Sequence, residues 1–244
     1  MGAPTGRSGR AGHEVTAVLE RGTVELRGRL PWSSNATFLT ELVGAGPAPV
    51  LAIYKPESGE RPLWDFPAGL WKREVAAYLV SEALGWALVP PTVARAQAPL
   101  GPGSVQLWVE ADYEQHYFTL LEDGAHHPAL RRVAVFDVLI NNADRKGGHL
   151  LLDGGGHVWA IDHGVCFHAE PKLRTVVWDF AGEKVDAALL DDLGPISTGE
   201  LPSGLDRLLE ADELAALETR ARRLRRRGRY PAPSTDFPYP WPLI

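Results

Sequence analysis

The chain has 244 residues, of which 45% are hydrophobic and 23% charged, and its formal net charge is −6. A chain of this length can bury one sizeable core or two small lobes that share a cleft. The acidic balance provides no global attraction to nucleic acid or anionic lipid, and no run of about twenty apolar residues is present to form a membrane-spanning helix.

The first twelve residues are rich in glycine, arginine and serine and contain no apolar core segment. This composition predicts a disordered leader over residues 1–13 rather than a signal peptide. Cys166 is the only cysteine in the sequence, so a disulfide within the chain is excluded. A reducing cytoplasm is the simplest setting for such a chain, and we therefore expect a cytoplasmic protein.

The first regular elements read as two strands around a turn. Thr23–Leu30 and Thr37–Val43 have strand-like composition, and the segment between them includes Ser33, Ser34 and Asn35. No Gly-x-Gly-x-x-Gly loop is present. Hydroxyl, amide and backbone N–H groups of such a turn can bind phosphate oxygens, although Ser-Ser-Asn is also ordinary turn composition.

A strand and a helix follow. Val50–Pro56 is an apolar run that ends in Lys55 and a proline, and the proline should stop the strand there. The segment 68–84 has helical spacing, with Gly85 placed as a C-terminal stop. Two of its glutamates are candidates for a functional role. Glu74 lies next to the apolar stripe, whereas Glu82 lies at the C-terminal end, where the helix dipole disfavours negative charge.

Further along, Val105–Val109 reads as a strand. Arg131–Ile140 is then an apolar helix. It leads directly into a polar stretch, Asn141–His149, which we regard as the most informative part of the chain.

This stretch contains Asp144 and Lys146, and Asp162 follows thirteen residues after its end. Two short apolar runs around a glycine-rich turn separate the two parts, which predicts a hairpin that returns the chain to the same edge. Phosphoryl transfer needs a carboxylate to orient the acceptor hydroxyl, a cation to spread the developing charge and carboxylate oxygens to hold Mg²⁺. Asp144, Lys146 and Asp162 suit these three roles in that order.

The pattern Asp144-Arg145-Lys146-x-x-His149, together with Asp162-His163-Gly164, resembles the catalytic and metal-binding loops of the phosphatidylinositol 3-/4-kinase superfamily and of HipA-type bacterial kinases. The resemblance implies an α+β, bilobal protein-kinase-like fold, with a small β-rich N-lobe holding one main helix and a compact, mostly helical C-lobe. It also implies ATP and Mg²⁺, with Mn²⁺ as a second option. One position departs from the family: His149 stands where a metal-binding Asn is usual, and Mg²⁺ prefers oxygen ligands.

The resemblance assigns roles to the upstream elements as well. A kinase-like lobe supplies a strand lysine for the α- and β-phosphates and a helical glutamate that pairs with it, and Lys55 and Glu74 fit these positions. The turn with Ser33, Ser34 and Asn35 would contact phosphate oxygens. By the same resemblance, Val105–Val109 would be the last strand of the N-lobe and residues 110–112 the hinge. Backbone groups from Trp108 to Glu110 would bind the adenine. Asp162 and His149 would form the metal site.

The expected domains are an N-lobe over 14–110, a C-lobe over 111–230 and a proline-rich tail over 231–244. The tail has too many prolines for a helix or a central strand, and an extended strap and a mobile end both fit its sequence. A helix from Glu210 onward ends in a run of arginines between Arg220 and Arg229, which complements the helix dipole. A weak contact of this run with an anionic partner is the alternative.

The sequence thus predicts an ATP-dependent phosphotransferase of unknown acceptor, which could be a lipid, a small molecule or a protein hydroxyl. No nucleic-acid partner is expected. The alternatives are a nucleotide-binding pseudokinase scaffold, with His149 marking a lost metal site, and a nucleotidyl (AMP) transferase. A transition-metal site or a cysteine nucleophile within a histidine-rich group is a weaker alternative, because the spacing matches no usual zinc pattern; this group is His149, His157, His163, Cys166 and His168.

Overall fold

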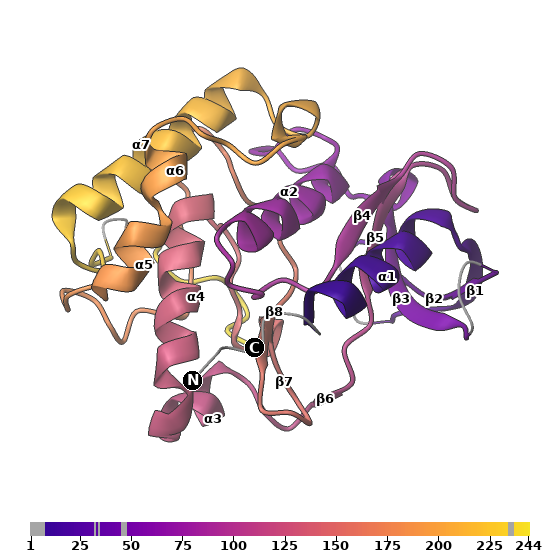
Figure 1. Cartoon of the computed structure of the whole chain (residues 1–244), viewed down its shortest axis with the longest axis horizontal. Coiled ribbons are helices and arrows are strands. Elements are labelled where there is room, and N and C mark those ends of the chain that lie inside the picture. The colour runs from indigo at the N-terminus through magenta and orange to yellow at the C-terminus, as the bar shows by residue number, and fades with distance from the viewer. Residues whose placement is uncertain (1–7, 32, 34, 45–47, 234–236) are drawn as a thin grey trace. The chain divides into compact units, whose positions relative to one another are not determined.

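The computed structural model describes residues 8–31, 33, 35–44, 48–233 and 237–244, with side chains from Glu14 onward (Figure 1). The chain divides into two compact units. Unit 1 contains the residues up to Val75 together with Pro90–Trp108, and unit 2 contains Ala76–Val89 and Val109–Ile244. Residues 76–89, which the sequence analysis assigned to the N-lobe, therefore cluster with unit 2.

Unit 1 is built on an antiparallel sheet of five strands within the described residues, in the order β1-β2-β3-β5-β4. The strands are β1 (Thr23–Arg29), β2 (Phe38–Val43), β3 (Val50–Pro56), β4 (Thr92–Arg95) and β5 (Gly103–Leu107). Helix α1 (Ser8–Arg21) lies along this sheet (Figure 1) and contributes Val18 and Leu19 to a core that also contains Leu42, Tyr54 and Val105. Burial of these apolar side chains holds the helix on the sheet.

The expectation of a disordered leader over residues 1–13 is wrong for its second half. Residues 8–13 form the first turns of α1, and residues 1–7 lie outside the described part of the chain. The helix is stabilised from its other end, where Arg95 Nη1 donates to Leu19 O at 2.8 Å and to Gly22 O at 2.9 Å. These two bonds satisfy carbonyls at the C-terminus of the helix with a cation, which its dipole favours.

Strand β3 places Lys55 at a fixed point of the sheet. Ala52, Tyr54 and Pro56 are buried and Lys55 is half-buried, as strand alternation requires. Lys55 pairs in register with Ser104 of β5. The neighbouring residue Gly103 must be glycine, because a Cβ there would lie 2.4 Å from Lys55 O.

Helix α2 (Leu70–Ala83) begins two residues later and ends one residue earlier than predicted, and Gly85 terminates it as expected. Glu60 accepts hydrogen bonds from the backbone N–H of Gly69 and of Trp71, both at 2.8 Å, and so caps the start of the helix. At the end, Gly85 has φ +66°, and the N–H of Gly85 and of Trp86 bond to Glu82 O and Ser81 O. This is a Schellman stop, which needs glycine at its left-handed position.

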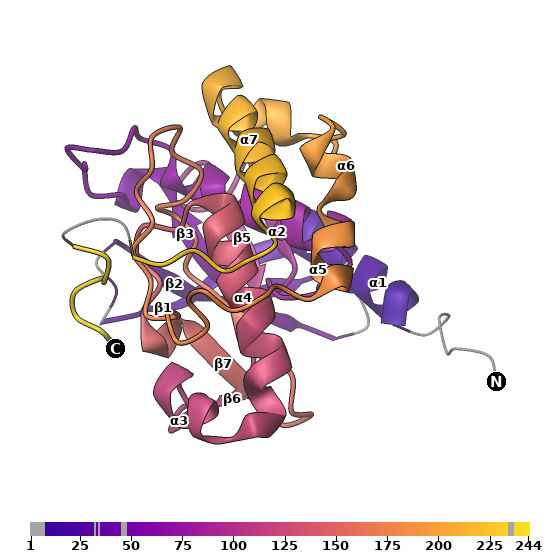
Figure 2. The same ribbon diagram turned by 90° about the vertical axis from the view of Figure 1, so that its left-hand side faces the viewer.

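Unit 2 is mostly helical. Its helices are α3 (Tyr117–Glu122), α4 (His127–Ile140), α5 (Ala187–Asp192), α6 (Gly194–Ser197) and α7 (Ala211–Arg227), and a small antiparallel sheet is formed by β6 (Ala111–Asp112), β7 (Leu150–Asp153) and β8 (Val158–Ala160). Short 3-10 turns cover Glu57–Gly59 in unit 1 and Gly124–His126, Gly147–His149 and Leu205–Arg207 in unit 2. Helix α4 is the core element, because Val133, Phe136, Leu139 and Ile140 are fully buried, and α7 packs against it (Figure 2).

The arginines at the end of α7 serve the fold to a large extent. Arg220 donates to Leu139 O at 2.7 Å, Arg225 to Leu190 O at 3.0 Å and Arg229 to Gly182 O at 2.6 Å, while Arg222 pairs with Glu218. Three of these arginines therefore bind carbonyls of other segments of unit 2, and the acidic first turn and basic last turn of α7 keep the charge order that suits its dipole. A contact with an anionic partner stays a prediction.

Among the described residues, no helix is both long enough and apolar enough to cross a membrane. The proline-rich tail packs as a strap from residue 237 onward. Pro238 O accepts hydrogen bonds from Thr175 N at 3.0 Å and from Trp178 Nε1 at 3.1 Å. Of the two arrangements that the sequence left open, the structure therefore has the strap.

Candidate functional site

Helix α4 delivers the chain to the loop that carries Asp144 and Lys146. The helix ends at Asn141, which adopts φ +54°, and the loop runs on to His149. Lys146 Nζ lies 2.8 Å from Asp144 Oδ2, with 32% of the Asp144 side chain and 20% of the Lys146 side chain exposed. Burial raises the pKa of the Asp144 carboxyl, Lys146 opposes this rise, and the charge of Asp162 adds to it. Asp144 is therefore a carboxylate of raised basicity that solvent can still reach.

Asp162 follows β8 and lies beside His149. His149 Nε2 is 3.3 Å from Asp162 Oδ2, and the Asp162 side chain is 49% exposed. The hairpin β7–β8 brings them together, because Ile161 N donates to His149 O at 3.0 Å. Asp162 has φ +63°, a strained conformation for a residue other than glycine, and such strain concentrates at functional sites.

These two residues fit a divalent cation in part. Mg²⁺ is usually held by one or two carboxylates plus the phosphates of its substrate, so Asp162 with a triphosphate is sufficient. The imidazole of His149 is a nitrogen donor, which suits Mn²⁺ better than Mg²⁺. Within the described residues, no group of three or more His, Cys, Asp or Glu side chains is arranged to hold a metal ion.

The other histidines of the predicted cluster are engaged elsewhere. His157 Nε2 lies 2.8 Å from Ala87 O, and its ring packs edge-on against Trp159. His163 is fully buried and its ring packs edge-on against Phe136. These contacts favour structural roles for both residues. Cys166 is fully buried, which is typical of an unreactive thiol.

The loop that carries Asp144 is supported by a buried ion pair, which the sequence analysis did not predict. Arg145 and Asp137 have fully buried side chains, and Arg145 Nε lies 3.1 Å from Asp137 Oδ1. The same carboxylate accepts from Asn142 Nδ2 at 3.0 Å and from Thr175 Oγ1 at 3.1 Å. Asn142 also accepts from the backbone N–H of Asp144 at 3.0 Å. The position of Asp144 is thus fixed by a hydrogen-bonded network that reaches down to α4.

Arg145 extends this network to the segment that carries Asp162. Its Nη1 donates to Ile161 O at 2.7 Å and its Nη2 donates to His163 Nε2 at 2.7 Å. The residues on both sides of Asp162 are therefore bound to one guanidinium group. A planar guanidinium with five donors can make such a set of contacts, and lysine cannot.

Asn141 holds the segment that follows Asp162. Its Nδ2 donates to His168 O at 2.8 Å and to Glu170 O at 2.7 Å, and its Oδ1 accepts from Lys172 N at 2.9 Å. Arg174 is bound next, since its backbone N–H donates to Asn142 O at 2.9 Å and its carbonyl accepts from Arg145 N at 3.0 Å. Its charge also lowers the pKa of Asp144, although burial dominates there. Arg174 is a further cation of the site that the sequence did not reveal.

In unit 1, Lys55 and Glu74 are in contact. Lys55 Nζ donates to Glu74 Oε1, and 21% of the Lys55 side chain and 4% of the Glu74 side chain are exposed. This is the pairing that the resemblance to kinases implies. Glu82, the other candidate, is exposed near the end of α2.

The remaining predicted nucleotide-binding residues are less distinctive. Asn35 Oδ1 accepts from Arg61 N at 2.9 Å, so its amide oxygen anchors a loop of unit 1. Ser33 is half-buried, and Ser34 lies outside the described residues. The backbone N–H of Trp108 donates to Leu51 O at 3.0 Å and Glu110 is exposed. The Trp108 amide therefore bonds to a carbonyl of β3, and its role in binding an adenine stays a prediction.

Comparison with solved structures identifies the fold. The chain superposes on hydra Fam20, solved with sugar, with a TM-score of 0.57 at 16% identity, covering 92% of this chain and 90% of the other. A Golgi casein kinase with Mn/ADP bound gives a TM-score of 0.57 at 12% identity, covering 90% and 75%. The Helicobacter pylori proinflammatory kinase CtkA gives 0.50 at 11% identity, covering 87% and 94%. The α+β, protein-kinase-like fold is confirmed.

No family model matches the sequence. A curated relative does match, with 42% identity over 271 aligned positions that include 93% of this chain and 95% of the relative. This chain therefore belongs to the family of Protein Rv2133c from Mycobacterium tuberculosis.

Proposed function

We propose that this protein is an ATP-dependent phosphotransferase that phosphorylates a hydroxyl group, and that it is a member of the phosphatidylinositol 3-/4-kinase-like superfamily. The observation that carries the proposal is the ion pair of Asp144 and Lys146 at 2.8 Å, with the charge of Asp162 near enough to raise the Asp144 pKa. A base, a cation and a metal-binding carboxylate are the groups that phosphoryl transfer requires.

The roles follow from the chemistry of each group. Asp144 accepts the proton of the acceptor hydroxyl, and its raised pKa makes it a better base than an exposed aspartate. Lys146 offsets the negative charge that develops on the transferred phosphoryl group. In unit 1, Lys55 binds the α- and β-phosphates and Glu74 fixes the position of its ammonium group.

Asp162 and His149 would hold the divalent cation that binds the triphosphate of ATP. The bound cation would supply charge neutralisation between the β- and γ-phosphates. The printed description of the Golgi casein kinase, which has Mn/ADP bound, supports nucleotide and divalent metal as ligands of this fold. The lipid of the superfamily name is not implied, because one fold serves many acceptors. A cytoplasmic setting is supported by the single, buried Cys166.

The presence of a histidine at position 149 favours a second candidate, a nucleotide-binding pseudokinase scaffold. An imidazole in place of an amide oxygen weakens a magnesium site. A third candidate, transfer of AMP, uses the same groups with the other end of the triphosphate as leaving group.

A thermal-shift titration with ATP separates these candidates when it is combined with product analysis. A ligand that binds only the folded state raises the melting temperature. The kinase predicts a rise that depends on Mg²⁺ or Mn²⁺, together with ADP as product. A metal-independent rise without product would indicate the scaffold, and pyrophosphate would indicate AMP transfer. No rise with any metal would contradict all three.

A further inference from the structure

The C-terminal segment Phe237–Ile244, here called the strap, is bound to the loop between Asn141 and His149. This loop carries Asp144 and Lys146 and is here called the catalytic loop. Leu243 O accepts a hydrogen bond from the backbone N–H of Gly147 at 2.7 Å. Gly147 lies directly after Lys146 and two residues before His149, and it is buried. The strap thus contacts the loop between its proposed catalytic cation and its proposed metal ligand.

The strap has a second attachment point on the segment that follows Asp162. Pro238 O accepts from Thr175 N at 3.0 Å and from Trp178 Nε1 at 3.1 Å. Thr175 in turn donates from its hydroxyl to Asp137 Oδ2 at 3.1 Å, so this attachment reaches the buried network beneath Asp144. One short length of chain therefore connects the catalytic loop to the segment that would face an acceptor.

The strap does not cover the groups it holds. With the strap in place, the side chain of Asp144 is 32% exposed and that of Asp162 is 49% exposed. An inhibitory segment that occupied the site would bury these two carboxylates. The strap turns Pro240 inward, and its aromatic residues Phe237 and Trp241 are 81% and 86% exposed.

We propose that the strap is a positioning element that holds the catalytic loop in its active arrangement, and that it does not inhibit the site. The inference rests on the proposed phosphotransferase function. Without the strap, the backbone N–H groups of Gly147 and Thr175 each lose the carbonyl acceptor that the strap provides. The loop between Lys146 and His149 then samples other conformations, while the Lys55–Glu74 pair of unit 1 is unaffected.

Hydrogen–deuterium exchange of the full chain and of a variant lacking residues 237–244 tests the contact independently of activity. We expect exchange in a peptide covering 144–150 to rise by roughly fivefold to tenfold, the equivalent of one net hydrogen bond, and exchange in β3 to stay unchanged. In parallel, we measure hydrolysis of ATP to ADP and phosphate, in which water takes the place of the unidentified acceptor. Its kcat should fall about tenfold, with the KM for ATP within about twofold.

A pair of glycine variants provides the same test without deleting residues. A Cβ on Gly147 would lie 3.2 Å from Phe118 Cε2 and 3.4 Å from both Ile244 Cγ1 and Leu243 O, whereas a Cβ on Gly148 would meet only Ile244 Cγ2 at 3.7 Å. Gly147→Ala should therefore loosen the strap and lower kcat, and Gly148→Ala should keep wild-type exchange.

Three results decide the proposal. Unchanged exchange in the loop after deletion, and in Gly147→Ala, would overturn the contact. A higher kcat after deletion would show that the strap inhibits, and would overturn its positioning role. Increased exchange with no ADP formation by any form, the full chain included, would leave the strap's hold on the loop intact and reject the phosphotransferase function.

Discussion

Replacing Asp137 should destabilise unit 2 more than any change at its surface. Asp137 and Arg145 have no exposed side-chain surface, so Asp137→Ala leaves a buried guanidinium without its carboxylate. Removing one partner of a buried ion pair costs about 3–5 kcal/mol. Asn142 and Thr175 also lose the acceptor of a hydrogen bond, at about 1 kcal/mol each. We expect a loss of about 5–7 kcal/mol in the free energy of unfolding, which is comparable to the total stability of many domains.

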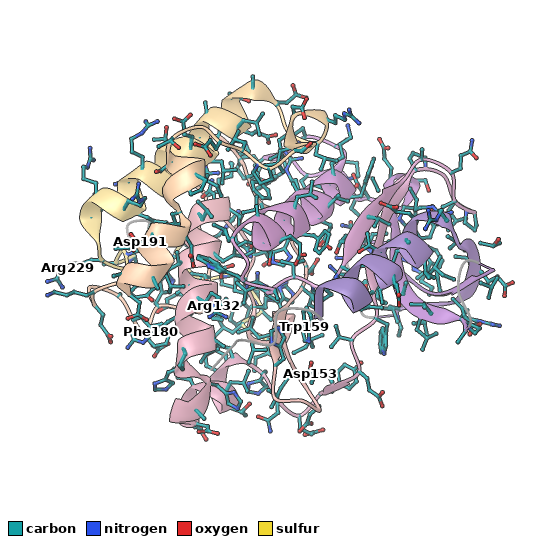
Figure 3. All side chains as sticks on the ribbon, viewed as in Figure 1. Arg132, Asp153, Trp159, Phe180, Asp191 and Arg229 are labelled. Atoms are coloured by element: carbon teal, nitrogen blue, oxygen red, sulfur yellow. The ribbon has the colours of Figure 1, made fainter. Side chains whose placement is uncertain are left out.

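Urea unfolding followed by circular dichroism measures this loss. Asp137→Asn should lose less, about 2–3 kcal/mol, because it keeps one acceptor oxygen. Asp191→Ala on α5 is the matched control, since Asp191 is exposed (Figure 3), and it should stay within about 0.5 kcal/mol of wild type. A loss below about 1 kcal/mol for Asp137→Ala would refute the claim that this pair supports the catalytic loop.

Three further outcomes are expected. Gly103→Ala should destabilise unit 1 by about 1–3 kcal/mol and reduce the thermal shift with ADP, because its Cβ would lie 2.4 Å from Lys55 O. Gly28→Ala is the control, because a Cβ there would meet nothing within 4 Å. Equal stabilities of the two variants would contradict the close packing at Gly103. His149→Asn should raise stabilisation by ADP with Mg²⁺ relative to Mn²⁺, and an unchanged ratio in a thermal-shift assay would contradict its place in the metal site. Burial raises the pKa of Asp153, but hydrogen bonds from Trp159, His157 and Gly155 outweigh it and hold the pKa below 3.8. The ionised carboxylate of Asp153, whose side chain is labelled in Figure 3, therefore adds stability above pH 3.8, and this stability is lost as the pH falls through the lower pKa of the folded state. Asp153→Asn should be less stable than the wild type at pH 7 and equally stable in strong acid. A difference in stability that does not depend on pH would reject this assignment.

The parts of the site that could be predicted are those with short-range patterns. Lys55 closes an apolar strand before a proline, and Glu74 lies on the next helix beside an apolar stripe. These patterns placed the two residues on a strand and a helix, and the resemblance to kinases implied that they pair. The hairpin between His149 and Asp162 was evident from two apolar runs around glycines. In each case the deciding contacts lie within one or two neighbouring elements.

The parts that were missed depend on contacts between distant residues. Asp137 lies in a helix whose apolar pattern gave no reason to single out a carboxylate, and its partners Arg145 and Thr175 are 8 and 38 residues away. The sequence analysis assigned no role to the Asn141 side chain, which holds a segment about thirty residues further on. Helix α1 was missed over its whole length, because the composition at its start favours disorder, whereas tertiary packing of its later turns decides the outcome.

The central claim, that Asp144 is the base of a phosphotransferase, is tested most directly by ATP turnover. The measurement is hydrolysis of ATP to ADP and phosphate, with water as the acceptor and with Mg²⁺ or Mn²⁺, by the wild type, Asp144→Asn and the exposed control Asp191→Ala. The account predicts that the wild type and the control turn over ATP, and that Asp144→Asn loses at least about a hundredfold in kcat while its ADP-dependent thermal shift is retained. Full turnover by Asp144→Asn, or ATP binding by the wild type without any turnover, would contradict it.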